Sequence, residues 1–199
     1  MRVLVTREEL TARVESLGHD AILCELIRVE PLGNEPVDAS AYDWLVVTSR
    51  NGAHELARRG VTANRIAAIG PATADALRSH GLRVDLVAAT HTQEGLREEL
   101  REGTILLAAA EGARRDVLDG DFLPLYRTIE LRPVPPDADI ALLMSGSAAR
   151  ALAATGARMP VVAIGPQTAA EARAAGLDVA AVADIHDLDG LVEALRSVS

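Results

Sequence analysis

Short apolar runs alternate with amphipathic segments along the whole chain. Runs rich in Val, Ile and Leu are typical of buried strands, and apolar residues three or four positions apart are typical of helices. We therefore expect strands at residues 2–6, 21–29, 43–48, 65–69, 84–87, 104–108, 122–131, 139–144, 161–164 and 179–182. Helices are expected at residues 7–17, 53–59, 71–80, 92–101, 114–118, 148–154, 166–175 and 188–196. This alternation predicts right-handed crossovers and parallel sheets that are covered by helices on both faces.

One stretch occurs twice. Residues 68–74, Ala-Ile-Gly-Pro-Ala-Thr-Ala, return as residues 163–169, Ala-Ile-Gly-Pro-Gln-Thr-Ala. In both copies an apolar run ends at Gly, which allows a tight turn, and Pro follows at the first helical position. The free N–H groups of the helix start and a Thr hydroxyl then lie at the turn, which suits an anionic group. His91 and His186 also correspond in this repeat, and we expect a local structural role for them because each precedes a helix.

The other elements of the first half recur in the second half as well. Two small flavodoxin-like sheets fit into 199 residues. Segments rich in Pro, near residues 31–38 and 131–137, read as linkers on either side of a middle segment. The chain is therefore either two domains in tandem, divided near Gly103, or a middle domain inserted into a domain built from both chain ends. The pattern by itself leaves both arrangements open.

Composition excludes several classes of protein. Every basic side chain is Arg, and without Lys there is no Walker A loop, no pyridoxal Schiff base and no Lys nucleophile. Aromatic residues make up 2% and the net charge is −9, which argues against nucleic-acid binding. Cys24 is the only cysteine, so no disulfide forms within the chain. No apolar run approaches the ~20 residues of a membrane span and no signal-peptide pattern opens the chain, so we expect a soluble cytoplasmic protein.

Four small polar turns follow expected strands and open helices. Ligands of open parallel sheets bind at the carboxyl ends of the strands, which is where these turns lie. The turns suggest an anionic ligand held between two domains, although Ser and Thr at such places often serve only as helix caps. Arg7 follows the first strand at the same rim, where an exposed ion pair is the alternative. The candidate substrate-binding residues are Arg7, Ser49, Asn51, Gly70, Thr73, Ser145, Ser147, Gly165 and Thr168.

The remaining side chains offer little classical chemistry. The five histidines show no metal-ligand spacing and no Cys lies near them, so no metal site is expected. There is neither a Gly-x-Ser-x-Gly elbow nor a Gly-x-Gly-x-x-Gly turn. Tyr126 is one of two tyrosines and lies just before the second linker. Core or edge packing is the alternative reading of a single Tyr in a strand.

Taken together, the motifs resemble the uroporphyrinogen-III synthase family over nearly the full chain. The resemblance is carried by the order and spacing of Leu4-Val5-Thr6-Arg7, Tyr42-Asp43-Trp44-Leu45, Thr48-Ser49, Ala68-Ile69-Gly70 with Thr73-Ala74, Thr92 with Glu94-Gly95-Leu96, Tyr126-Arg127-Thr128, Ser145, and Ala163-Ile164-Gly165-Pro166 with Thr168-Ala169. The chain departs from the family pattern in being short, in Val47 before Thr-Ser, and in Asp187-Leu188-Asp189 at the second Thr-x-Glu-Gly-Leu position.

The resemblance implies two similar α/β domains, one inserted into the other and joined by a two-stranded linker. The discontinuous domain would comprise residues 1–32 and 133–199, and the inserted domain residues 33–132. The implied enzyme is a cofactor-free, monomeric lyase that cyclises hydroxymethylbilane, a linear tetrapyrrole with eight carboxylates. It inverts the last pyrrole ring through a spiro intermediate and releases water. By residue matching, Tyr126 is the candidate proton donor to the leaving hydroxyl, while Thr73 and Thr168 line the two sides of the cleft.

Two other functions fit the residue pattern. A hinged pair of α/β domains also suits a cytoplasmic binding or sensor protein without catalysis. A flavodoxin-like nucleotide or flavin protein is the second alternative, but few aromatic side chains are present to flank a ring system.

Overall fold

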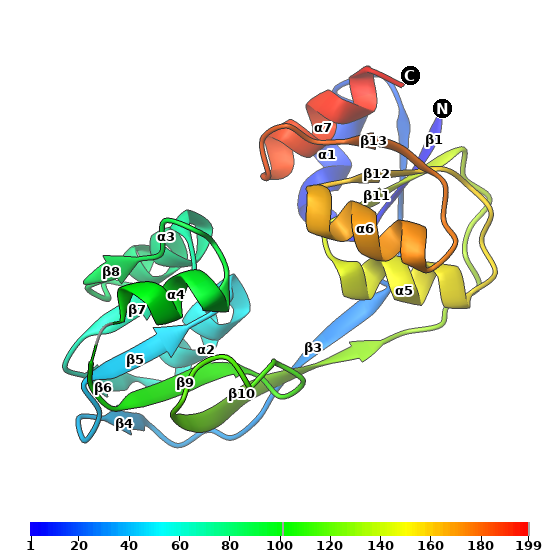
Figure 1. Ribbon diagram of the computed structural model, residues 1–199. Helices are drawn as coiled ribbons and strands as arrows, with labels where there is room; N and C mark the ends of the chain where they lie inside the picture. The colour runs from blue at the N-terminus through cyan, green and yellow to red at the C-terminus, as the bar shows by residue number, and fades with distance from the viewer. Residues whose placement is uncertain (101, 199) are drawn as a thin grey trace. The chain divides into compact units, whose positions relative to one another are not determined.

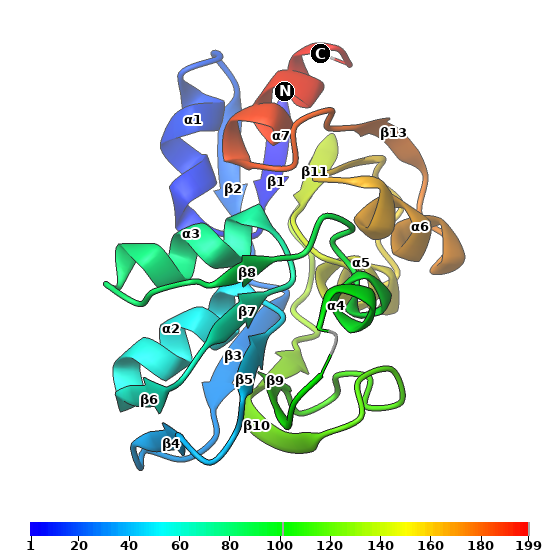
Figure 2. The same ribbon diagram turned by 60° about the vertical axis from the view of Figure 1, so that its left-hand side comes forward.

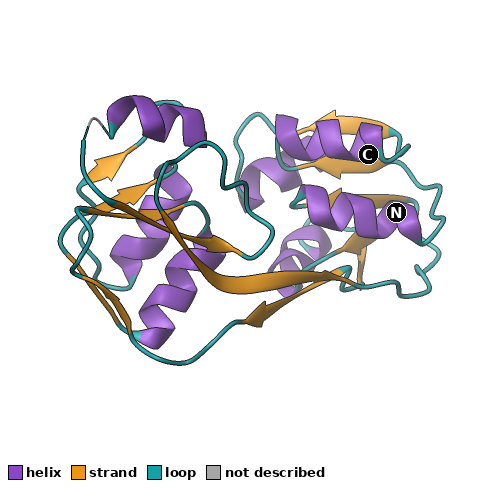
Figure 3. Ribbon diagram, turned by 60° about the horizontal axis from the view of Figure 1, so that its bottom comes forward, coloured by secondary structure: helices purple, strands orange, loops and turns teal. Residues whose placement is uncertain are grey.

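The structure, a computed structural model, describes every residue except 101 and 199 and contains two compact units (Figure 1). The first unit comprises residues 1–28 and 129–199, and the second comprises residues 29–128. Each is built on a sheet of mainly parallel strands with helices on both faces (Figure 3), so the predicted α/β fold class is confirmed. No helix in the described part of the chain is long and apolar enough to cross a membrane.

The sheet of the first unit has the strand order β13-β12-β11-β1-β2, and all four neighbouring pairs are parallel. Read from β2, this is the 2-1-3-4-5 order of flavodoxin-like folds. The strands are β1 (Arg2–Val5), β2 (Asp20–Leu23), β11 (Ile140–Leu143), β12 (Val161–Ala163) and β13 (Val179–Val182). The helices are η1 (Glu8–Leu10), α1 (Thr11–Glu15), α5 (Gly146–Ala154), α6 (Pro166–Ala174) and α7 (Leu188–Arg196).

Alternation along the strands of the first unit decides which helices cover which face. Val3 and Val5 of β1 pack with α1 and α7, whereas Leu4 between them packs with α5 and α6. Successive side chains of a strand point to opposite faces, so a strand that is buried on both sides is apolar throughout. This is why β11, β12 and the part of β1 after Arg2 appear in the sequence as uninterrupted apolar runs.

The sheet of the second unit has the order β3-β10-β9-β5-β7-β8. In Figure 2, α2 and α3 lie on one side of its strands and α4 lies on the other, in agreement with its two apolar clusters. Five of its strands repeat the spatial order of the first unit. The elements are β3 (Ile27–Pro31), β5 (Trp44–Val47), α2 (Arg50–Arg59), β7 (Ile66–Ala68), α3 (Pro71–Ser79), β8 (Leu86–Val87), α4 (Gln93–Glu99), β9 (Ile105–Ala110) and β10 (Asp121–Glu130), with a small parallel pair, β4 (Val37–Ala39) and β6 (Val61–Ala63).

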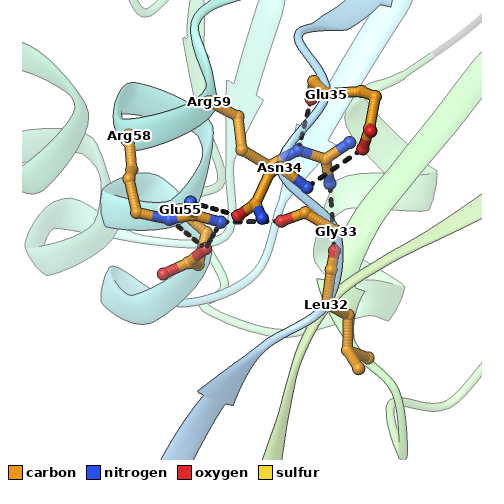
Figure 4. Close-up of polar contacts among 7 residues, drawn as sticks. All are labelled: Leu32, Gly33, Asn34, Glu35, Glu55, Arg58 and Arg59. Atoms are coloured by element: carbon orange, nitrogen blue, oxygen red, sulfur yellow. Dashed lines mark hydrogen bonds and ion pairs between the residues drawn. The ribbon is translucent and has the colours of Figure 1, made fainter.

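Strands β3 and β10 carry the chain from one unit to the other and are neighbours in the sheet. After β3, the backbone of residues 32–35 is held by the last two residues of α2 (Figure 4). The guanidinium of Arg59 donates to the carbonyl oxygens of residues 32 and 35, at 3.3 and 2.7 Å. Arg58 donates to the carbonyl of residue 33 at 2.8 Å and also pairs with Glu55 at 2.8 Å. The segment predicted as a linker is therefore tied to α2 within its own unit.

Two sequence predictions about local structure were wrong, and one pair of strands was not predicted. No helix forms at residues 114–118, because Val117 and Leu118 are the only apolar residues there and provide no helical stripe. The run 21–29 is two strands, not one, since β2 pairs with β1 whereas β3 belongs to the other sheet. The pair β4 and β6 was not anticipated. The predicted helix end at Arg101 lies outside the described residues.

Candidate functional site

The predicted site residues lie at or next to the carboxyl-terminal ends of the parallel strands in the two sheets. Each edge collects the turns that follow the strands, and each contributes half of the predicted set. The second unit supplies Ser49, Asn51, Gly70, Thr73 and Tyr126, and the first unit supplies Arg7, Ser145, Ser147, Gly165 and Thr168.

Ser49 follows β5 and is the N-cap of α2. Its Oγ accepts a hydrogen bond from the N–H of Gly52 at 3.0 Å. A Cβ at position 52 would lie 3.2 Å from that oxygen, so Gly is favoured where the cap is this tight. The predicted capping role is thus real. It is not the only role of the hydroxyl, because Ser49 Oγ also lies 2.8 Å from the hydroxyl oxygen of Tyr126.

Tyr126 reaches Ser49 from β10. Pro124, which has no N–H to give to the ladder, precedes a register shift against β9, and Tyr126 then pairs with Ala110. Such irregularities re-aim side chains. Tyr126 is 5% exposed, and its ring packs with Val47 and Ala53 in the apolar cluster. The polar contact of this side chain is therefore made by its hydroxyl alone.

The first unit has a related turn without a tyrosine. Ser145 caps α5 by accepting from the N–H of Ala148 at 3.2 Å, and its Oγ lies 3.0 Å from Ser147 Oγ. Ser147 therefore occupies the hydrogen-bonding position that Tyr126 holds in the second unit. In both units a serine caps the helix that follows the strand, but only in the second unit does a tyrosine hydroxyl contact that serine.

The two Gly-Pro turns lack the caps that the other long helices have. Gly70 and Gly165 are the N-caps of α3 and α6, with extended backbone (φ −179° and −177°) and no side chain to accept from the helix. By contrast, side chains cap α2, α4, α5 and α7. The first N–H groups of α3 and α6 are consequently left for solvent or a ligand.

Thr73 and Thr168 occupy the third positions of these uncapped helices. They are 5% and 6% exposed, and neither hydroxyl has a hydrogen-bond partner among the described residues. Neither oxygen is sealed from solvent. A buried hydroxyl without a partner is uncommon, and these two lie where the repeat predicted anion binding.

Arg7 and Asn51 are half-buried and have free polar groups. Arg7 follows β1 after one residue, and within the described part of the chain its guanidinium has no ion pair or hydrogen bond. Asn51 lies in the first turn of α2 and its side chain has no partner there either. Among the described residues, Arg7 therefore does not form the ion pair that was considered as an alternative.

The contact between Ser49 and Tyr126 was missed by the sequence analysis. The two residues are 77 positions apart, and no local pattern links them. The signal that could have paired them is the strand order, which places β10 two strands from β5, with β9 between. Among residues 1–100 and 102–198, no cluster of His, Cys, Asp or Glu could hold a metal ion.

In sequence and in fold, the chain is similar to known proteins of one family. The family model described as uroporphyrinogen-III synthase HemD matches residues 8–193. A curated relative from Archaeoglobus fulgidus, whose name gives uroporphyrinogen-III synthase as a provisional assignment, is 28% identical over 99% of both chains. The crystal structure of a mutant uroporphyrinogen III synthase from Thermus thermophilus shares the fold, with a TM-score of 0.68 and 18% identity, covering 99% of this chain and 98% of that one. The chain therefore belongs to the uroporphyrinogen-III synthase family.

Proposed function

We propose that the ten turn and strand residues described above bind hydroxymethylbilane and promote its closure to uroporphyrinogen III. Membership of the family makes the chain a cyclising lyase of tetrapyrrole biosynthesis. Unassisted closure gives the isomer with an uninverted ring, so the protein must mainly hold geometry. Correct positioning alone can contribute several kcal/mol to a rate.

Carboxylate binding is the first part of the proposal. The substrate carries eight carboxylates, and the uncapped starts of α3 and α6 offer N–H groups and the partly solvent-accessible hydroxyls of Thr73 and Thr168. Helix N-termini favour anions through both hydrogen bonding and the helix dipole. Arg7 adds a cation without a competing carboxylate in the described part of its unit.

Proton transfer is the second part. The hydrogen bond of 2.8 Å between Tyr126 and Ser49 is the observation that carries it. Tyr126 is buried, whereas Ser49 is half-buried. When Tyr126 donates to Ser49 Oγ, the Ser49 proton is free for the leaving hydroxyl. That hydroxyl departs as water, and the proton lost from the attacked pyrrole carbon on closure restores the pair. The two residues are unchanged after a turnover.

Incubation with freshly prepared hydroxymethylbilane tests the function. After oxidation, the porphyrin isomers are separated and quantified. The type III isomer is the expected product; type I product at the rate of the buffer blank would instead favour a binding or sensor protein.

The same proposal includes a monomer that works in the cytoplasm without a metal or cofactor. The only cysteine, Cys24, is buried and free, which suits a reducing compartment. Light scattering coupled to size exclusion measures the mass of the particle. A mass near 21 kDa is expected for the 199-residue chain.

A further inference from the structure

Each Gly-Pro turn is covered by a histidine from the next turn of the same sheet. A Cβ built on Gly70 would lie 3.0 Å from Cγ of His91, and one on Gly165 would lie 3.2 Å from Cδ2 of His186. In both units the imidazole thus lies against the N-cap glycine of the uncapped helix. Any side chain in place of the glycine would crowd the ring, so Gly and His fit each other as a pair.

The pair is retained although the surrounding turns differ. After His91 the chain continues Thr-Gln-Glu, and after His186 it continues Asp-Leu-Asp. Thr92 and Asp187 cap the following helices equally well with different chemistry. Capping therefore explains the residues after each histidine, but it does not explain the histidines.

Packing does not explain them either. Both side chains are exposed, so an aliphatic residue would cover the glycine as well. In the described part of the chain neither imidazole forms a hydrogen bond or an ion pair, even though Asp184 and Asp187 lie on either side of His186 in sequence. Each ring has an N–H to donate and no acceptor for it among residues 1–100 and 102–198.

Three kinds of unused donor thus meet at one turn in each unit. They are an imidazole N–H, the hydroxyl of Thr73 or Thr168, which is more than nine-tenths buried, and the backbone N–H of residue 72 or 167. A set of donors without an acceptor fits an anion with several lone pairs, and a carboxylate accepts at both oxygens.

The geometry points to His91 and His186 as carboxylate-binding residues, each closing a clamp with the start of α3 or α6. This inference rests on the proposed function, because it assigns the two clamps to two acidic side chains of the tetrapyrrole. The histidines bind and position the substrate, while proton transfer stays with Ser49 and Tyr126.

Variants of each histidine separate binding from structure. In His91→Ala and His186→Ala we expect KM to rise about three- to tenfold, with kcat nearly unchanged, as for a lost hydrogen bond to a charged group at a solvent-exposed place. His91→Gln and His186→Gln keep an N–H donor and should recover part of the loss. His19→Ala, at the start of β2 and so at the opposite edge of its sheet, is the control and should leave KM unchanged. Unchanged KM in both alanine variants overturns the inference.

A binding measurement that needs no turnover provides the second test. The imidazole resonances of the wild-type protein are followed by NMR during titration with uroporphyrin, a rigid porphyrin with eight carboxylates. His91 and His186 should shift and His19 should not, and the octamethyl ester of the same porphyrin should shift neither. No shift of His91 or His186 at saturation overturns the inference. Shifts in a protein that makes only type I product would support the clamps and contradict the proposed function.

Discussion

At the residue scale, the proposed site depends on a few polar side chains that have no hydrogen-bond partner among the described residues. The repeat predicted the Gly-Pro turns and their threonines from local physics alone, since Gly, Pro and Thr at a strand end specify a turn and a helix start. The repeat assigned His91 only a local role, because its contact with Gly70, 21 positions earlier, cannot be predicted from the residues next to it in sequence. The Ser49–Tyr126 contact could not be predicted for the same reason.

Removing the phenol proton should be the most damaging of the conservative changes. Tyr126→Phe keeps the packing of the ring, so kcat should fall about 10²–10⁴-fold with little change in KM, the usual contribution of general acid catalysis. Thr73→Ala and Thr168→Ala each remove a neutral hydrogen bond to substrate and should cost about three- to thirteenfold. Steady-state kinetics on the three variants gives the order directly. Equal losses in all three would assign Tyr126 to packing.

Ser49 is predicted to have two separable roles. Ser49→Ala should lose helix stability of about 0.5–2 kcal/mol, as for other caps, and also the rate that Tyr126→Phe loses. Thr92→Ala removes the cap of α4 in the same unit and is the matched control, with a similar loss of stability and no loss of rate. Urea unfolding and kinetics are measured on both. Full activity of Ser49→Ala would leave Ser49 as a cap only.

At the element scale, the alternation of apolar runs and amphipathic segments was sufficient to locate most strands and helices. It failed at residues 21–29, where one apolar run contains parts of two strands. It also failed at residues 111–120, where charged residues and Gly form a connection without a helix. Pairing partners decide such places, and pairing is a property of the folded sheet.

The contact between Asp43, just before β5, and Thr104, just before β9, makes the stability of the fold sensitive to acid. Hydrogen bonds from the backbone N–H and then the hydroxyl of Thr104 hold the pKa of Asp43 below its usual 3.8. A carboxylate with a lowered pKa stabilises the fold above its unfolded pKa, and this stability is lost as the pH falls through the folded value. Asp43→Asn should therefore flatten the loss of stability below pH 3.8, as measured by urea unfolding at pH 7 and pH 3. Asp119→Asn, at an exposed carboxylate without a partner among the described residues, should change nothing.

The turn that opens α4 tolerates no side chain at Gly95. A Cβ there would collide with the carbonyl oxygen of Thr90, which is backbone and cannot rotate away. Gly95→Ala should cost about 1–3 kcal/mol of unfolding free energy, as for other overpacked sites. Gly112→Ala has open space around its Cβ and is the control, expected within about 0.5 kcal/mol of wild type. Equal stability of the two variants would contradict the packing described for this turn.

At the scale of the whole molecule, each unit has its own sheet, helices and apolar core. The sequence alone could not choose between tandem and inserted domains, because both arrangements contain the same elements in the same order. The choice depends on which strands pair. β9 and β10, which follow Gly103, pair within the sheet that contains β5, which precedes it.

We predict that the inserted segment folds by itself. A fragment of residues 29–128 contains a complete unit and should unfold cooperatively. A division after Gly103 separates β5 from β9 and β1 from β11, so neither fragment should fold cooperatively. Circular dichroism during urea unfolding reports on each fragment. Cooperative unfolding of residues 1–103 would contradict the arrangement.

The most direct measurement of the central claim compares wild type and Tyr126→Phe on the same batch of hydroxymethylbilane, with the rate and the isomer ratio recorded together. The wild type should give type III product, and Tyr126→Phe should give the same isomer about 10²–10⁴-fold more slowly, because geometry is kept and one proton is lost. Type I product from the wild type, or an undiminished rate in Tyr126→Phe, would contradict the account.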